Sequence, residues 1–457
     1  MGIIAFVKIA KLLNASNFSI ALLITIISLG TNLNYYISYH PSCSHVYSFF
    51  AVNWFMYFGF KWARTLSNKY LFLLGFSFGL IFIIRPTNTV ILILIPFLFC
   101  SWDNFKTEFI LLFKSKKKYL LLATIFALVP IAFHFAVKLN ETGSLAVNSY
   151  QDEGFDYLFC PRVFDVLFSY RKGFFTYAPA MLLIIPGIYS LYTESKNLTK
   201  GWFIVATVFL YITASWWCWW YGGGHGMRAL IDLLTFFSLP ILLLLNRSSL
   251  LGKLVITIFS ITMIYYYQTM QYQYRLNIIL YDNMTKEGFW KVFLKTDRRF
   301  GWMLTTKSYK INENEICSKK TLFLNPITAK WTTKKSPTSE YIMRKQQDEL
   351  TIYFSPKKSW RGKKMGIRFR GKMMITREYI NPNAYVNYFK NGNVVKTNCI
   401  YLGYSIDRLN EYQYFSVDYE SFKTDSKYDS LGLTFTRGEH ITKFKELSTT
   451  FYSLEQK

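Results

Sequence analysis

The stretch WWCWWYGGGHGMR, residues 216–228, lies between two long apolar segments and determines the fold class of the chain around it. Tryptophan dominates its first half, three consecutive glycines follow, and a histidine and an arginine precede the next apolar segment. Amphipathic aromatic rings are favoured where a bilayer meets water. Irregular backbone at membrane depth is tolerated only where it lines a cavity or is buried in protein. The stretch therefore predicts a loop between two membrane-spanning helices, at the bilayer surface.

The chain divides into an apolar first part and a polar, lysine-rich and turn-rich second part. A spanning helix needs about 20 mostly apolar residues, and about nine segments reach this length or fall a few residues short of it. We therefore expect a polytopic α-helical membrane domain over residues 1–267. Its predicted spans are residues 18–37, 46–62, 70–84, 88–101, 119–138, 176–192, 202–217, 229–246 and 253–267.

Lysine and arginine are distributed unevenly among the predicted loops. Alternate loops are rich in them, most clearly at Lys114 and Lys116–Lys118, whereas the loops between carry few. Cytoplasmic loops of membrane proteins show this excess of positive charge. The alternation continues without a break across all nine segments. It places the polar part of the chain outside the cytoplasm, together with loops 38–45, 85–87, 139–175 and 218–228.

The polar part combines short β-favouring runs with turn signals. FKNGNVV predicts a hairpin around Asn391–Gly392, and strands at such spacing suggest a mainly-β, sandwich-like domain. We expect a linker over residues 268–300 and an extracytoplasmic β-rich domain over 301–457. Its basic strands suit contact with anionic lipid or polysaccharide, and a docking domain without a ligand is the alternative.

The net charge of +26 raises the question of a nucleic-acid partner. No nucleic-acid-binding motif is present, and half of the chain is too apolar to fold in water, so we expect membrane lipid and no nucleic acid as a partner. The six cysteines show no zinc-binding spacing. Cys317 and Cys399 could pair if the polar part is extracytoplasmic, and two unpaired thiols are the alternative.

Cationic residues recur in the loops predicted to face outward. Arginine presents a planar fork suited to phosphate, the N–H groups of a helix start add positive partial charge, and glycine lets the backbone approach a ligand closely. These features predict a site for an anionic group at the outer surface. The predicted phosphate-binding residues are Arg228, Arg85, Arg171, Lys172 and His225, and the predicted lining residues are Trp219, Trp220, Tyr221, Gly222, Gly223, Gly224 and Asn88.

Each of these residues also has a structural interpretation. The aromatic rings could serve only as an interfacial belt, although this does not explain the glycines. Arg85 could be an anchor that extends to water, and Arg171 and Lys172 could contact lipid headgroups. Asp232 stands four residues after Arg228, so on a helix the two would form a salt bridge.

Three of these motifs, IIRPTN (83–88), FSYRKGFF…YAP (168–179) and WWYGGGHGMR (219–228), resemble motifs of bacterial multi-pass glycosyltransferases. The likeness is to the GT-C superfamily, among relatives of the protein O-mannosyltransferase group (family 39), and it covers roughly residues 18–270. It implies an inverting transferase of the bacterial inner membrane. Such an enzyme takes a sugar from a polyprenyl-phosphate carrier to a glycan, lipid or protein acceptor outside the cytoplasm. By this similarity Arg228 would contact the phosphate of the donor.

The chain departs from the GT-C pattern at the expected catalytic acid. GT-C enzymes resemble one another most in an acidic residue of the first outward loop, which acts as base or metal partner, and loop 38–45 has none. Residues 2–13 resemble the end of a helix whose beginning is missing, which suggests an N-terminally truncated chain. Asp152 and Glu153 are the candidate bases, and a solvated loop is the alternative for both. A divalent metal is compatible with the resemblance, but no metal ligands are recognisable.

Two other functions fit the same sequence. A non-catalytic or truncated membrane relative would retain the outward cations without a base. A transporter of lipid-linked sugars should show paired broken helices in matched halves, and the sequence contains no such repeat.

Overall fold

The computed structural model divides the chain into two compact units. The first comprises Met1–Tyr274 and Tyr281–Leu294, and the second comprises Arg275–Leu280 and Lys295–Lys457. The residues that the structure describes are 1–144, 153–282, 284–297, 300, 304, 316–325, 330–333, 341–343, 349–355, 360, 364–375, 383–401, 411–423, 430–436 and 442–454.

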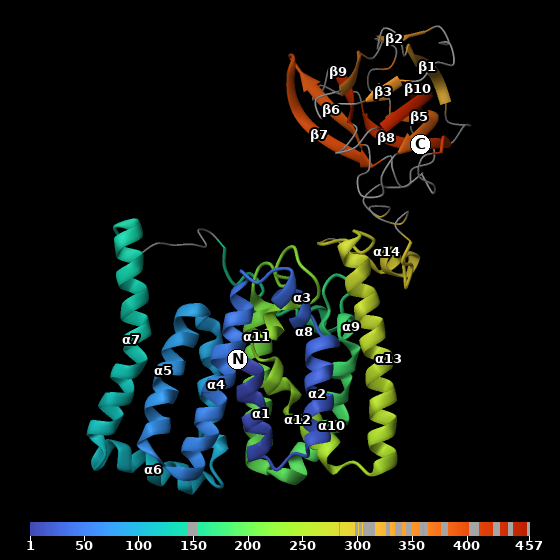
Figure 1. The fold of residues 1–457 in the computed structure, drawn as a ribbon. Helices are drawn as coiled ribbons and strands as arrows, with labels where there is room; N and C mark the ends of the chain where they lie inside the picture. The colour runs from blue at the N-terminus through green and yellow to red at the C-terminus, as the bar shows by residue number, and fades with distance from the viewer. Residues whose placement is uncertain are drawn as a thin grey trace. The chain divides into compact units, whose positions relative to one another are not determined.

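The first unit is helical (Figure 1). Its α-helices are α1 (Gly2–Leu12), α2 (Asn17–Leu29), α3 (Leu33–Ser38), α4 (Ser44–Thr65), α5 (Asn68–Ile84), α6 (Trp102–Lys114), α7 (Lys117–Thr142), α8 (Val163–Phe168), α9 (Phe174–Tyr177), α10 (Ile184–Glu194), α11 (Lys196–Ser215), α12 (Leu234–Arg247), α13 (Leu250–Arg275) and α14 (Lys286–Lys291). Three segments are 3₁₀-helices: η1 (Pro86–Leu98), η2 (Pro179–Leu183) and η3 (Arg228–Ile231).

Three helices within the described ranges are long and apolar enough to cross a bilayer: α7, α11 and α13. A fourth span results if η1 and α6, which meet at a bend of 109°, are counted as one. The predicted helical N-terminal region is therefore confirmed. The prediction of about nine spans is not confirmed, because several predicted segments form shorter helices, and residues 176–192 divide among α9, η2 and α10.

The helices lie side by side, with α3 and α14 at one end of the bundle and α6 at the other (Figure 1). At the edge of the bundle α7 packs against α5, where Gly75 and Gly79 permit close approach. A Cβ atom on either glycine would collide with the backbone carbonyl of Ala123 or Ala127 in α7. Small residues at such positions are the usual means of close helix packing in membranes.

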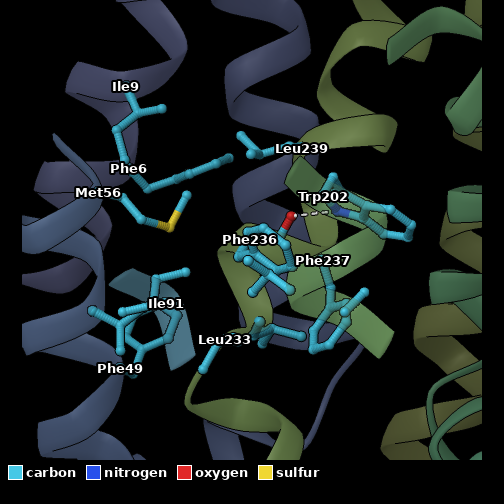
Figure 2. Packing of buried hydrophobic residues seen from close by; sticks show 14 of the residues in the cluster. Phe6, Ile9, Phe49, Met56, Ile91, Trp202, Leu233, Phe236, Phe237 and Leu239 are labelled. Carbon is cyan, nitrogen blue, oxygen red and sulfur yellow. Dashed lines mark hydrogen bonds between the residues drawn. The ribbon is translucent and has the colours of Figure 1, made fainter. Parts of the chain in front are cut away.

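The core of the helical unit surrounds α12. Every residue from Leu234 to Leu243 is buried, and a helix that is apolar on all sides is stable only when other elements cover it. Figure 2 shows Phe236 and Phe237 of this helix among side chains from α1, α4, η1 and α11. The indole Nε1 of Trp202 in α11 donates a hydrogen bond to the Phe236 carbonyl at 3.0 Å. Because α12 is central, the residues immediately before it are held inside the protein.

The second unit contains two antiparallel sheets, which confirms the predicted β-rich C-terminal region. A six-stranded sheet has the order β2-β1-β10-β5-β8 with β3 paired to β10, and a four-stranded sheet has the order β4-β9-β6-β7. The strands are β1 (Ile316–Asn325), β2 (Lys330–Thr332), β3 (Tyr341–Met343), β4 (Glu349–Phe354), β5 (Lys364–Ile375), β6 (Asn383–Lys390), β7 (Asn393–Tyr401), β8 (Gln413–Lys423), β9 (Ser430–Thr436) and β10 (Thr442–Leu454).

Side chains of both sheets share one apolar core. Phe354 of β4 stacks on Phe451 of β10 with 3.9 Å between ring centroids. The hairpin predicted around Asn391–Gly392 joins β6 to β7, and both residues have positive φ, as a tight hairpin turn requires. The pairing of Cys317 with Cys399 stays a prediction, because the Cys399 side chain lies outside the described residues.

The predicted topology can be tested at two exposed positions in a background from which the native cysteines have been removed. Val394 near the start of β7 is 54% exposed, and Ser115 lies in the exposed turn between α6 and α7. Val394→Cys should react with an impermeant thiol reagent in intact cells, whereas Ser115→Cys should react only after lysis. The reverse pattern would overturn the predicted orientation.

Candidate functional site

The glycine loop, residues 221–226, connects α11 to η3 and adopts a backbone that requires glycine. Gly222 and Gly224 have φ values of +67° and +151°, a region that side chains with a Cβ rarely occupy. A Cβ on Gly224 would also collide with the hydroxyl of Tyr36 in α3. Gly223 faces the ring of Tyr281, which lies 3.2 Å from the position of a Cβ on this glycine. The loop is therefore closely packed between α3 and the segment that follows α13.

Lys172 holds this arrangement together from the turn between α8 and α9. Its Nζ donates to the backbone carbonyl of Gly224 and, at 2.5 Å, to that of Tyr281. The side chain is only 2% exposed, and burial lowers the pKa of the ammonium group to about 7. Asp282 opposes this shift, while Arg228 and Arg171 add to it. Among the residues that the structure describes, no carboxylate lies within 4 Å of Nζ.

Arg171 is directed to the same segment. Its Nε donates to the Asp282 carbonyl at 3.0 Å, and its Nη2 donates to Asp282 Oδ1 at 3.0 Å. The guanidinium carbon lies 3.4 Å from the centroid of the Trp220 ring, in cation–π geometry. Arg171 and Lys172 thus both bind residues 281–282. The interpretation of these two cations as lipid-headgroup contacts does not account for these bonds.

Arg228 lies at the start of η3, beside the glycine loop. Its Nη1 approaches the Gly223 carbonyl at 3.4 Å, and its buried Nε has no hydrogen-bond partner in the described part of the chain. The predicted salt bridge to Asp232 is absent, since no carboxylate among those residues lies within 4 Å of this guanidinium. The reason is local: a 3₁₀-helix has three residues per turn, so positions four apart do not share a face.

Asp232 is instead the centre of a buried polar network. Its Oδ1 accepts from His45 Nδ1 at 2.8 Å, while Oδ2 accepts from Asn88 Nδ2 at 2.8 Å and forms an ion pair with Arg85 Nε at 2.9 Å. The carboxylate is 1% exposed. His45 Nε2 faces Arg85 Nη1 at 3.4 Å; because arginine can only donate, the imidazole proton resides on Nδ1.

This network changes the interpretation of two predicted site residues. Asn88 is fully buried and supports Asp232, so it does not line an open site. Arg85 is an ion-pair partner rather than only an anchor, although its guanidinium carbon still lies 5.9 Å from the Tyr221 ring centroid. The network joins α4, the N-terminal end of η1 and the residue that follows η3, and it thereby fixes the chain immediately after Arg228.

His225 is completely enclosed by aromatic rings. The rings of four tyrosines, Tyr35, Tyr177, Tyr267 and Tyr274, have centroids between 5.0 and 5.6 Å from its own. Burial, with a smaller effect from Lys172, lowers the pKa of the imidazole to about 3. It is therefore neutral at physiological pH and has no charge to offer the phosphate for which the sequence predicted it.

Of the two acids predicted as catalytic bases, only Glu153 belongs to the described residues. Asp152 lies outside the described residues. Glu153 is exposed and forms no ion pair within the described ranges. The acid found beside the cations is Asp282, 111 residues after Arg171, in a stretch that the sequence indicated only as a linker. Among the residues described, no group of three or more His, Cys, Asp and Glu side chains is arranged to hold a metal ion.

Comparison with known proteins adds little to this geometry. No family model matches the chain, and no curated protein matches it. The solved structure of the infectious bursal disease virus VP2 subviral particle is similar at a TM-score of 0.21 and 8% identity. The alignment covers 30% of this chain and 32% of the viral chain. A likeness of this strength carries no argument about fold or function.

The Asp232 network makes a direct prediction for stability. Asp232→Asn removes the charge that compensates the partly buried Arg85, and breaking a buried ion pair costs about 3 kcal/mol or more. The free energy of unfolding, measured by denaturant titration in detergent micelles, should fall by that amount. The matched control is Glu194→Gln, which removes an exposed ion pair with Arg247 and should cost less than about 1 kcal/mol. Equal effects of the two changes would contradict the network.

Proposed function

We propose that the protein is an integral membrane glycosyltransferase that moves a sugar from a polyprenyl-phosphate carrier to an acceptor outside the cytoplasm. The observation that carries this proposal is a pair of cations, Lys172 and Arg228, that flank the glycine loop without a carboxylate within 4 Å in the described part of the chain. The first is buried, and the second is partly buried. An anion of the ligand would supply the charge that these residues lack.

Moving a charge from water into the interior of a protein costs free energy. A buried ammonium group loses its hydration and is stable only when it is paired or gives up its proton. Two carbonyl oxygens provide hydrogen bonds to Lys172 but no opposite charge. A phosphate group would supply both negative charge and hydrogen-bond acceptors. Its oxygens can accept hydrogen bonds from the ammonium of Lys172 and from the planar guanidinium of Arg228.

The same residues suit the chemistry of transfer. When the bond between the sugar and its phosphate breaks, negative charge develops on the phosphate oxygen. Cations already fixed at that position stabilise the developing charge without having to reorganise. The aromatic side chains Trp219, Trp220 and Tyr221 precede the glycines directly and support a site with one apolar wall, as a lipid-linked sugar requires.

The position of these cations in the bundle also supports the proposal. Tyr36 of α3 contacts the glycine loop, and α3 lies at the end of the bundle opposite α6 (Figure 1). The lysine-rich turn after α6 is predicted to be cytoplasmic. On that orientation the site opens on the outer side of the bacterial inner membrane, where polyprenyl-linked sugars are used by the enzymes that the chain resembles.

Substitution of Arg228 tests the phosphate assignment. Arg228→Lys keeps the charge but loses the fork, so it should weaken binding of a lipid phosphodiester on the order of tenfold, and Arg228→Ala should weaken it further. Affinity is measured on purified, folded protein in detergent. The control is Arg247→Lys, which changes an arginine of the exposed pair with Glu194 and should leave affinity unchanged. Unaltered affinity in Arg228→Ala would refute the assignment.

The pKa of Lys172 makes a second prediction. A bound phosphodiester raises the pKa of this ammonium from about 7, so binding takes up a proton when the pH is above that value. Below pH 7 the lysine is already charged and affinity should be constant. Above pH 7 affinity should fall, approaching about tenfold per pH unit.

The probe is a phosphodiester lipid, whose own charge does not change between pH 6 and 9. The charged groups that affect Lys172 are Asp282, Arg228 and Arg171. Lys172→Met should bind more weakly at pH 6 and should lose the pH dependence. A wild-type affinity that is constant from pH 6 to pH 9 would exclude Lys172 from the anion site.

A further inference from the structure

The acids on this side of the helical unit differ in how fully their oxygens are occupied. Asp232 is 1% exposed and both of its oxygens are held, by His45 on one side and by Arg85 and Asn88 on the other. It is therefore closed to a substrate. Asp165 pairs with Arg162 at 3.7 Å on an exposed helix, away from the glycine loop in the contacts observed.

Asp282 differs from Asp232 both in exposure and in the number of oxygens that are held, and it differs from Asp165 in lying beside the glycine loop. Its side chain is 28% exposed, and only Oδ1 is held, by Arg171 at 3.0 Å. Among the residues that the structure describes, none donates a hydrogen bond to Oδ2. The carboxylate thus combines one fixed oxygen with one that a ligand could reach.

The backbone around Asp282 is fixed to the same cations that define the site. Arg171 binds both the carbonyl and the side chain of Asp282, and Lys172 binds the carbonyl of Tyr281. The Gly224 N–H approaches the Tyr281 carbonyl at 3.4 Å. Asp282 is therefore held beside the glycine loop as firmly as the cations are, which is what a group that must meet a substrate requires.

We infer that Asp282 is the carboxylate that receives the proton of the acceptor hydroxyl. This inference rests on the proposed function and assigns its missing base. The acceptor oxygen forms a bond to the anomeric carbon of the donor sugar, and its proton passes to Asp282 Oδ2. The bond from that carbon to the phosphate oxygen breaks, and its electron pair stays on the phosphate. Arg228 and Lys172 neutralise the charge so formed.

Arg171 acts in this step as a positioning residue. Its guanidinium lies against the Trp220 ring and donates a hydrogen bond to Oδ1 of Asp282. The direction of Oδ2 is therefore set by an arginine side chain that is itself held in place. The other oxygen, Oδ2, is then placed to take up a proton as the acceptor attacks.

The test separates chemistry from binding. Asp282→Asn should lower the rate of sugar transfer by about 100-fold or more, while the affinity for a lipid phosphodiester stays within about threefold of the wild-type value. Asp282→Ala should regain part of its transfer activity when formate is added, because a small carboxylate can replace the lost base. Glu287→Gln, which alters an exposed acid of α14, should transfer at the wild-type rate.

Two outcomes would overturn the assignment. Transfer by Asp282→Asn within about tenfold of wild type would show that the proton goes elsewhere. Loss of phosphodiester affinity in Asp282→Asn, with no rescue of Asp282→Ala by formate, would show that the residue only fixes the segment. Either result leaves the proposed function intact if Arg228→Ala still weakens phosphodiester binding by more than about tenfold. A wild-type protein that binds no phosphodiester would instead refute the proposed function, and the base with it.

Discussion

The rest of the candidate site depends on the hydrogen bonds that the Lys172 ammonium group donates to the Gly224 and Tyr281 carbonyls. The ammonium group joins three segments that are far apart in the sequence: the turn before α9, the glycine loop and the residues after α13. Without that contact the Gly224 and Tyr281 carbonyls would lack their common donor, and a buried carbonyl without a partner is costly. Burial, together with the nearby cations Arg228 and Arg171, lowers the pKa of this lysine. In the function that we propose, an anion of the ligand compensates the positive charge at this position.

The surrounding architecture explains why the site is rigid. Because α12 is buried on every side, the chain that enters it is fixed, and Asp232 fastens that chain to α4 and to the turn before η1. Arg85 completes this network and still lies near Tyr221. The polar network and the proposed anion site are therefore neighbours. The first supports the loop, and the second is left with cations that have no carboxylate in the described part of the chain.

The two regions of the fold and the loop of the candidate site could be predicted from local sequence patterns. The apolar runs predicted a helical region, and the short β-favouring runs predicted a β-rich region after it. The WWCWWYGGGHGMR stretch identified the loop that Lys172 and Arg228 flank. Local patterns predicted poorly where the backbone is irregular. The segment 88–101 was expected to span as one helix, yet η1 is a 3₁₀-helix that turns through 109° into α6. The same conformation in η3 separates Arg228 from Asp232.

Local sequence patterns did not predict the contacts between residues that are far apart in the chain. No spacing connects Arg171 with Asp282, since 111 residues separate them and Asp282 lies in a polar stretch without a motif. His225 was predicted from the sequence to bind phosphate, and only the folded chain shows that four tyrosine rings surround it and that burial lowers its pKa to about 3. The common cause is that burial, which sets both charge and availability, is a property of the folded chain.

The most direct measurement is an experimental structure of the purified protein with a short-chain polyprenyl phosphodiester sugar, determined by electron cryomicroscopy in a lipid nanodisc. From the proposed function we expect phosphate density in contact with Arg228 and Lys172 beside the glycine loop, with the sugar toward Asp282. Phosphate density at any other place in the helical unit, with Arg228 and Lys172 unchanged and solvated, would contradict it.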